Sequence, residues 1–242
     1  MATEPLKPMA GYWGRLKADL LRQTPTPTIP DGESQWDYKE SPSQLWTRHG
    51  IQTGLSPSDF STFRPAMQPS PEGKQQAADA LAAFVLWSSG KGRPWLLCIG
   101  LTGCGKSHLL KAALHSMVIA NDKGYYMTAA QFNRRMKNFD ADPGLVTPDE
   151  YVYKLGEMKA PLLIDDIGAG YYDKSGYLLT RFEELLDMRY EASLPTAVTS
   201  NLEPAQFKQH IGQRIFSRLL DRNMTEQVLM DKCVDIRQEE RP

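Results

Sequence analysis

Residues 98–110 are CIGLTGCGKSHLL, where glycines interrupt the passage from an apolar run to a helix-forming segment. Within this stretch, residues 100–107 match the pattern GxxxxGK[ST] at every fixed position. The glycines let the backbone curl until its N–H groups converge on phosphate oxygens, and the positive end of the following helix adds to the attraction. We therefore predict a nucleoside triphosphate site. Its candidate ligands are Gly100, Gly103, Cys104, Gly105, Lys106, Ser107 and His108.

Two side chains of this loop have distinct expected roles. Lys106 should present an exposed ammonium group to the β and γ phosphates, and the Ser107 hydroxyl should ligate Mg²⁺. The alternative is a glycine-rich turn from strand to helix that binds nothing. The apolar strand before the loop and the helical pattern after it favour the nucleotide site.

An acidic pair follows about sixty residues later, at the end of the apolar run in LLIDDIG, residues 162–168. Alone, two carboxylates at a strand end indicate only a solvated turn. Together with a phosphate loop, Asp165 can hold the Mg²⁺ shell, and Asp166 can orient and deprotonate the attacking water.

Asn201 ends a third apolar run, PTAVTSN, residues 195–201. Its neutral amide could hydrogen-bond the γ-phosphate or the lytic water. The alternative is a helix N-cap before LEPAQF, because Asn is a favoured capping residue. The accompanying loop and acidic pair favour the first role.

Arg214 and Arg218 lie four residues apart in GQRIFSRLLDRN, and therefore on one helical face. Such a pair is usually a solvated or ion-paired surface. Here the alternative is an arginine finger that reaches the γ-phosphate held by a neighbouring subunit. In that case the oligomer would be the enzyme.

The apolar runs at residues 94–100, 124–129, 161–168 and 195–201 are separated by segments long enough for helices. This alternation predicts an α/β fold with a parallel sheet. A further helix is predicted over residues 73–90.

The 242 residues suit one domain, residues 46–242, preceded by an appendage, residues 1–45. Residues 10–22 predict a short amphipathic helix that carries Trp13, and a linker rich in Pro, Ser and Thr follows. The net charge of −1 gives no sign of a strongly electrostatic nucleic-acid binder. No signal peptide or membrane span is apparent, so we expect a cytoplasmic protein, and its three cysteines should be buried free thiols.

In this order the motifs resemble the AAA+ ATPases, and more narrowly the DnaC/IstB family of helicase loaders and transposition helpers. The resemblance runs from about residue 49 to residue 237. It rests on GCGKSHLL, PLLIDDIG, RFEELLDMRYEASLPTAVTSNL and RIFSRLL.

The resemblance implies a three-layer α/β/α P-loop fold without a separate helical lid domain. It implies ATP and Mg²⁺ at Lys106 and Ser107, Walker B roles for Asp165 and Asp166, sensor 1 at Asn201 and a trans-acting finger at Arg218. Arg214 is the second finger candidate. The closing CVDIRQEE is similar to the family's terminal stretch and would give Arg237 a sensor 2 role, although the Ser-Tyr of that stretch is missing.

The family also has a DNA-contacting helical insertion after the second strand, here residues 128–158. Arg134, Arg135 and Lys137 could meet phosphates, with Phe132 or Phe139 stacking on single-stranded bases. The alternative is an ordinary helix whose aromatic side chains face the core.

The leading functional hypothesis is therefore an ATPase that binds a replicative hexameric DNA helicase, self-assembles and helps to place the helicase on single-stranded DNA. An IstB-like helper of transposition is the alternative, but a protein that coats duplex DNA should carry more positive charge. A P-loop small-molecule kinase would explain the loop but would not need Asn201 or the arginine pair.

Overall fold

The computed structural model describes residues 58–120, 124–137, 147–168 and 176–235. The expected N-terminal helix with Trp13, the linker, Phe139 and Arg237 lie outside these residues. None of the described helices is long and apolar enough to cross a bilayer.

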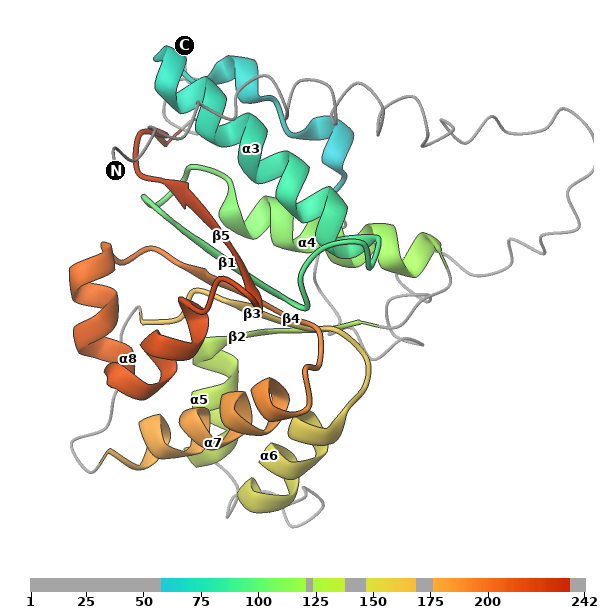
Figure 1. Cartoon of the computed structure of the whole chain (residues 1–242), viewed down its shortest axis with the longest axis vertical. Helices are drawn as coiled ribbons and strands as arrows, with labels where there is room; N and C mark the ends of the chain where they lie inside the picture. Colours follow the sequence, from blue (N-terminus) through green and yellow to red (C-terminus); the bar gives the residue numbers. More distant parts are fainter. Residues whose placement is uncertain (1–57, 121–123, 138–146, 169–175, 236–242) are drawn as a thin grey trace, which may run out of the picture. The chain divides into compact units, whose positions relative to one another are not determined.

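A parallel sheet of five strands forms the centre of this part of the chain (Figure 1). The strands are β1 (Trp95–Gly100), β2 (Tyr125–Thr128), β3 (Leu162–Asp165), β4 (Thr196–Ser200) and β5 (Thr225–Met230), in the order β2-β3-β4-β1-β5. The first four confirm the predicted strands. β5 was missed, because its buried and more exposed residues are mixed and only half of them are apolar.

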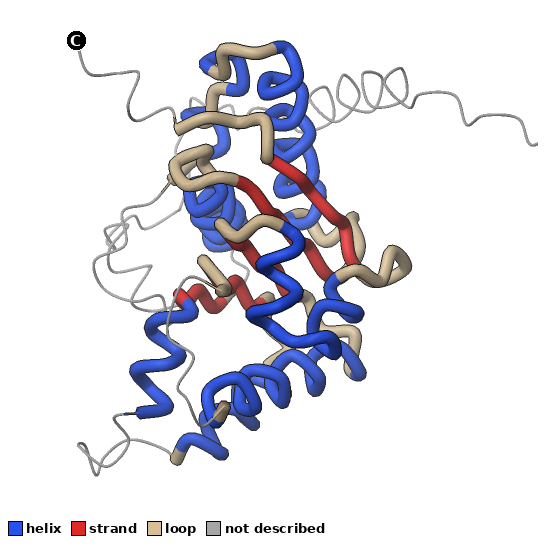
Figure 2. Tube along the Cα trace, turned by 90° about the vertical axis from the view of Figure 1, so that its left-hand side faces the viewer, coloured by secondary structure: helices blue, strands red, loops and turns tan. Residues whose placement is uncertain are grey.

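Helices cover both faces of the sheet, which confirms the three-layer α/β/α architecture (Figures 1 and 2). One face carries α3 (Pro71–Ser88) and α4 (Lys106–Ile119), packed on alternate residues of the strands. The other carries α5 (Ala129–Lys137), α6 (Pro148–Glu157), α7 (Tyr177–Glu191) and α8 (Pro204–Leu219). Two short 3₁₀ helices, η1 (Phe60–Thr62) and η2 (Pro65–Met67), precede α3.

The local sequence explains where α3 begins and which face it buries. The Ser70 hydroxyl accepts a hydrogen bond of 2.9 Å from the N–H of Gly73, and Pro71 occupies the first helical position. Ala77, Phe84 and their neighbours at helical spacing are buried against the sheet. The helix predicted over residues 73–90 is thus confirmed, with its start two residues earlier.

The strand order determines where a ligand can bind. β4 lies between β3 and β1, so the carboxyl ends of these three strands are adjacent. The chain leaves β1 through α4 and returns at β2, on the far side of β3 and β4. In open parallel sheets, ligands bind beyond the carboxyl ends of the strands at such a switch point.

Candidate active site

The loop between β1 and α4 needs glycine at two positions with positive φ. Gly103 has φ +80° and Gly105, the N-cap of α4, has φ +101°. A Cβ at Gly105 would lie 2.5 Å from the Phe63 ring, and one at Gly103 would lie 2.0 Å from the carboxyl carbon of Asp235. Only glycine therefore fits at these two positions, and the loop backbone can curl in the way that suits anion binding.

Lys106 is not exposed as expected, and this is a correction. Only 6% of the residue is accessible. Its ammonium group donates hydrogen bonds of 2.8 Å to the carbonyl oxygen of Gly100 and 2.7 Å to that of Leu101. The loop itself thus holds the positive charge beside the N-terminus of α4.

Asp165, the last residue of β3, lies in contact with the start of α4 and is 5% exposed. Ser107 donates a hydrogen bond of 3.0 Å to its Oδ1. Thr199 of β4 donates to the same oxygen at 2.5 Å, and Tyr126 of β2 donates to Oδ2 at 2.7 Å. The structure therefore brings together the two residues that the sequence assigned to Mg²⁺.

Asp166 has an unusual backbone and an unusual carboxyl group. Its φ is +62°, a conformation that few residues other than glycine adopt, and its N–H donates 3.0 Å to the Thr199 hydroxyl. Burial raises the pKa of the Asp166 carboxyl, the neighbouring charge of Asp165 raises it further, and the Lys106 ammonium opposes both. A raised pKa suits a general base working near neutral pH.

Asn201 directly follows β4 and is half-buried at the carboxyl end of the sheet. The alternative role as a helix cap is wrong, because the N-cap of α8 is Glu203. Because β4 separates β3 from β1, Asn201 follows a strand whose neighbours end at the acidic pair and the phosphate loop.

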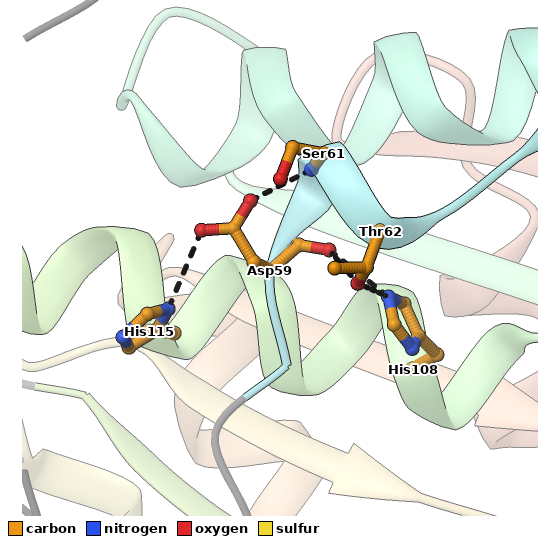
Figure 3. Close-up of polar contacts among 5 residues, drawn as sticks. All are labelled: Asp59, Ser61, Thr62, His108 and His115. Atoms are coloured by element: carbon orange, nitrogen blue, oxygen red, sulfur yellow. Dashed lines mark hydrogen bonds and ion pairs between the residues drawn. The ribbon is translucent and has the colours of Figure 1, made fainter.

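His108 contacts the segment before α3 (Figure 3). Its Nε2 lies 3.1 Å from the Thr62 hydroxyl and 3.0 Å from the carbonyl oxygen of Asp59. The Asp59 carboxylate accepts a hydrogen bond from the Ser61 N–H and lies 3.9 Å from Nδ1 of His115, also on α4. This segment places Phe63 against Gly105. A role for His108 as a nucleotide ligand stays a prediction.

Arg214 and Arg218 both form ion pairs with Asp187 of α7 in their own chain. Arg218 also contacts Glu191 at 3.2 Å, and its guanidinium group lies 5.0 Å from the ring centroid of Tyr190. Its side chain is 16% exposed, against 65% for Arg214. The finger role stays a prediction for both residues.

The side chains near the phosphate loop suit Mg²⁺ only together with other ligands. Among residues 58–235, apart from the undescribed gaps, no three His, Cys, Asp or Glu side chains are close enough to form a metal cage. Mg²⁺ commonly binds through one or two protein oxygens together with substrate phosphates and water. Ser107 and Asp165 fit that mode of binding.

The three thiols are buried and free, as expected. Burial raises the pKa of Cys104, within the loop, which leaves its thiol protonated.

Comparisons with known proteins agree with this geometry, although no family model matches the chain. The chain is 25% identical over 120 residues to the replicative helicase loader DnaC of Buchnera aphidicola subsp. Schizaphis graminum. That match covers 50% of this chain and 48% of that protein, so the chain spans about half the length of the curated relatives it matches.

Solved structures show the same fold. A crystal structure of the DnaC helicase loader has a TM-score of 0.56 at 18% identity, over 71% of this chain and 96% of the other. The replication initiator DnaA bound to AMPPCP and single-stranded DNA has a TM-score of 0.54 at 18% identity, over 72% and 51%. The chain has the AAA+ fold, and its resemblance to the DnaC/IstB family is confirmed.

Three residues at this candidate site were missed by sequence reasoning. Tyr126 and Thr199 contact Asp165. A signal existed for Thr199, which lies near the carboxyl end of β4, but Tyr126 is the second residue of β2 and had none. Asp235, whose carboxylate lies against Gly103, had no local signal.

Asp235 is positioned by a segment that precedes it and crosses the start of α3. The amide of Gln68 pairs with the backbone N–H and carbonyl group of Val234, at 2.8 and 3.4 Å. Gln76 accepts from the N–H of Lys232 at 2.8 Å and donates to Asp231 at 2.6 Å. Contacts between residues more than 150 positions apart cannot be inferred from local sequence patterns.

Proposed function

We propose that this chain is an ATPase that helps to load a replicative hexameric DNA helicase onto single-stranded DNA. The observation that carries the proposal is the sequence likeness to replicative helicase loaders over 120 residues. The hydrogen bond between Ser107 and Asp165 supports it, because it joins the phosphate loop to the acidic strand end.

In the proposed reaction, the N–H groups of the loop and the Lys106 ammonium bind the triphosphate. Ser107 and Asp165 would hold Mg²⁺, which when bound neutralises phosphate charge. Asp166 accepts a proton from the attacking water, and the Asn201 amide orients that water towards the γ-phosphate.

Single-stranded DNA is proposed to bind along α5. Its cations Arg134 and Lys137 are exposed, and the guanidinium group of Arg135 lies 5.3 Å from the ring centroid of Tyr151. The proposed stacking of bases on Phe132 is wrong, because that ring is fully buried and packs edge-on against Phe182. Binding of single-stranded DNA would therefore rest on contacts with its phosphates, and its affinity would fall as the salt concentration rises.

Self-assembly is proposed to complete the site. α8 follows the carboxyl end of β4, is interrupted by a kink at Gly212, and ends shortly before the start of β5. The carbonyl oxygen of Arg218, near its end, accepts a hydrogen bond of 3.4 Å from the hydroxyl of Thr225, the first residue of β5. Arg218 therefore lies towards the amino edge of the sheet, whereas the phosphate loop follows the carboxyl end of β1. A finger at Arg218 is therefore proposed to act on the nucleotide of another copy.

The proposal is tested by capture of the host's replicative helicase on the immobilised full chain, with a transposase as the control protein. We expect ATP-dependent capture of the helicase and no capture of the transposase. The opposite pattern would favour the transposition helper, and capture of neither would contradict the loader function.

The N-terminal segment is the proposed docking element, with Trp13 as an apolar anchor. Trp13→Ala should weaken helicase capture while leaving basal ATP hydrolysis intact. Loss of both activities together would indicate that Trp13 packs on its own domain instead.

A further inference from the structure

Tyr126 lies on the edge strand β2 and reaches the acidic pair from the side opposite the phosphate loop. β2 pairs with β3 in parallel, so Tyr126 is level with Leu163, two residues before Asp165. Residues 163 and 165 face the same side of the sheet, since strand side chains alternate. The phenol extends along this face to Oδ2 of Asp165, at 2.7 Å.

The Tyr126 hydroxyl acts as a hydrogen-bond donor. The residue is 1% exposed, and burial and the charge of Asp165 both raise the pKa of its phenol. The Lys111 ammonium lies 5.9 Å from the centroid of the ring. The phenol therefore stays neutral, and its only acidic proton points at the carboxylate.

The two oxygens of Asp165 have different partners. Oδ1 accepts from Ser107 and Thr199, and Oδ2 accepts from Tyr126. These hydroxyls come from α4, β4 and β2, so rotation of the carboxyl group would break contacts with three elements at once. Hydroxyl groups orient the carboxylate without neutralising its charge, which preserves its attraction for a divalent cation.

We infer that Tyr126 is a positioning residue of the proposed ATP site, where its hydrogen bond to Oδ2 keeps Oδ1 of Asp165 directed at Ser107 and so sets the affinity for the divalent metal. This inference rests on the proposed ATPase function. Partners that orient a metal-binding carboxylate act on metal affinity even though they do not touch the metal.

Tyr126→Phe removes only the hydroxyl, and Tyr125→Phe is the matched control. Tyr125 is its neighbour on the same strand, and its hydroxyl lies 3.1 Å from that of Tyr151 on the opposite face of the sheet. The probe is Mn²⁺ with the non-hydrolysable analogue AMP-PNP, and free Mn²⁺ is measured by electron paramagnetic resonance. Binding of a fluorescent ATP analogue in EDTA reports nucleotide affinity without metal.

Tyr126→Phe should weaken Mn²⁺ binding about 10-fold while nucleotide binding in EDTA stays as in the wild type. Tyr125→Phe should change neither quantity. Unchanged Mn²⁺ affinity in folded Tyr126→Phe would overturn the inference, as would an equal loss in Tyr125→Phe.

Thr199 provides a second, independent perturbation of the same carboxylate. Thr199→Val removes the hydroxyl at nearly constant volume and should also weaken Mn²⁺ binding, whereas Thr199→Ser keeps the hydroxyl and should restore most of it. Equal Mn²⁺ affinity in the Val and Ser variants would contradict the account. If the wild type binds no AMP-PNP, the proposed function fails; if it binds AMP-PNP and Mn²⁺ but no variant differs, only the inference fails.

Discussion

At the scale of single residues, Thr199 connects the two carboxyl groups of the site. Its hydroxyl donates to Asp165 and accepts from the backbone N–H of Asp166. This hydrogen bond holds the backbone of Asp166 at a positive φ, while burial and the charge of Asp165 raise the pKa of its carboxyl group; both are unfavourable for the folded chain. A strained backbone and a shifted pKa that the surrounding structure maintains are typical of catalytic residues.

The first prediction concerns Asp166→Asn. Hydrolysis should fall by about 100- to 10,000-fold because the amide cannot accept the proton of water. ATP binding should persist, and the melting temperature should be unchanged or slightly higher, since Asn also tolerates positive φ and carries no charge to bury. A drop of several degrees, or retained turnover, would contradict this role.

The second prediction is the pH dependence of turnover. Because the folded-state pKa of Asp166 is raised, its proton binds more tightly in the folded chain than in the unfolded chain. Its charge therefore costs stability at neutral pH, and this cost disappears as pH falls through the raised pKa.

Turnover should decline over the same acidic range, above the ordinary Asp value of about 4. A profile that stays flat down to pH 4 would exclude Asp166 as the base. Melting curves across the range separate loss of the base from acid unfolding.

At the scale of secondary structure, Arg189 of α7 joins three elements. It is fully buried, and burial lowers the pKa of Arg189 to about 10, so it stays charged at neutral pH. Its five N–H groups donate to the Thr196 hydroxyl and to the carbonyl oxygens of Leu155, Met158, Ala160 and Pro195.

The third prediction is that Arg189→Lys lowers the free energy of unfolding by about 3 kcal/mol, because an ammonium group cannot reach five acceptors arranged around a planar fork. The exposed Arg222→Lys serves as control and should change it by less than about 0.5 kcal/mol. Chemical denaturation measures both variants. Equal stability of the two would refute a structural role for Arg189.

The fourth prediction concerns α5. Arg134→Glu should weaken binding of a single-stranded oligonucleotide about 10-fold at moderate salt and reduce the salt dependence. Lys74→Glu on α3, an equally large charge change on the opposite face of the sheet, should have little effect. Fluorescence anisotropy at several salt concentrations checks this, and equal losses in both variants would indicate a nonspecific charge effect.

Local patterns explain how much of this structure could be predicted. The strands β1 to β4 are strongly apolar, and the loop motif depends on adjacent residues, so both were found from the sequence. β5 was not predicted from the sequence, because it is an edge strand with one partly exposed face and only half of its residues are apolar. The contacts of Gln68 with Val234, and of Asp235 with Gly103, depend on the folded path of the chain and leave no periodic signal.

At the scale of the whole molecule, the position of Arg214 and Arg218 in the second half of α8, after the kink at Gly212, determines what they can reach. Ion pairs with Asp187 hold both arginine side chains against α7 of their own chain. The side chain of Arg214 is the more exposed of the two. To act as a finger, either arginine must therefore break its ion pair with Asp187 and contact the nucleotide of a neighbouring subunit when subunits assemble. Arg218→Ala should bind ATP normally but lose about 1,000-fold or more in turnover.

The most direct test of the shared ATP site is to mix Arg218→Ala with Asp166→Asn, each inactive alone. An Asp166→Asn subunit still offers Arg218 to the intact pocket of an Arg218→Ala subunit, so random equimolar mixing gives a competent site at about a quarter of interfaces. ATP hydrolysis should reappear on mixing and vanish on dilution. A second mixture, with Arg214→Ala in place of Arg218→Ala, shows which of the two arginines acts as the finger. If both mixtures stay as inactive as their components while every variant still assembles, neither arginine acts in trans and the shared-site account is wrong.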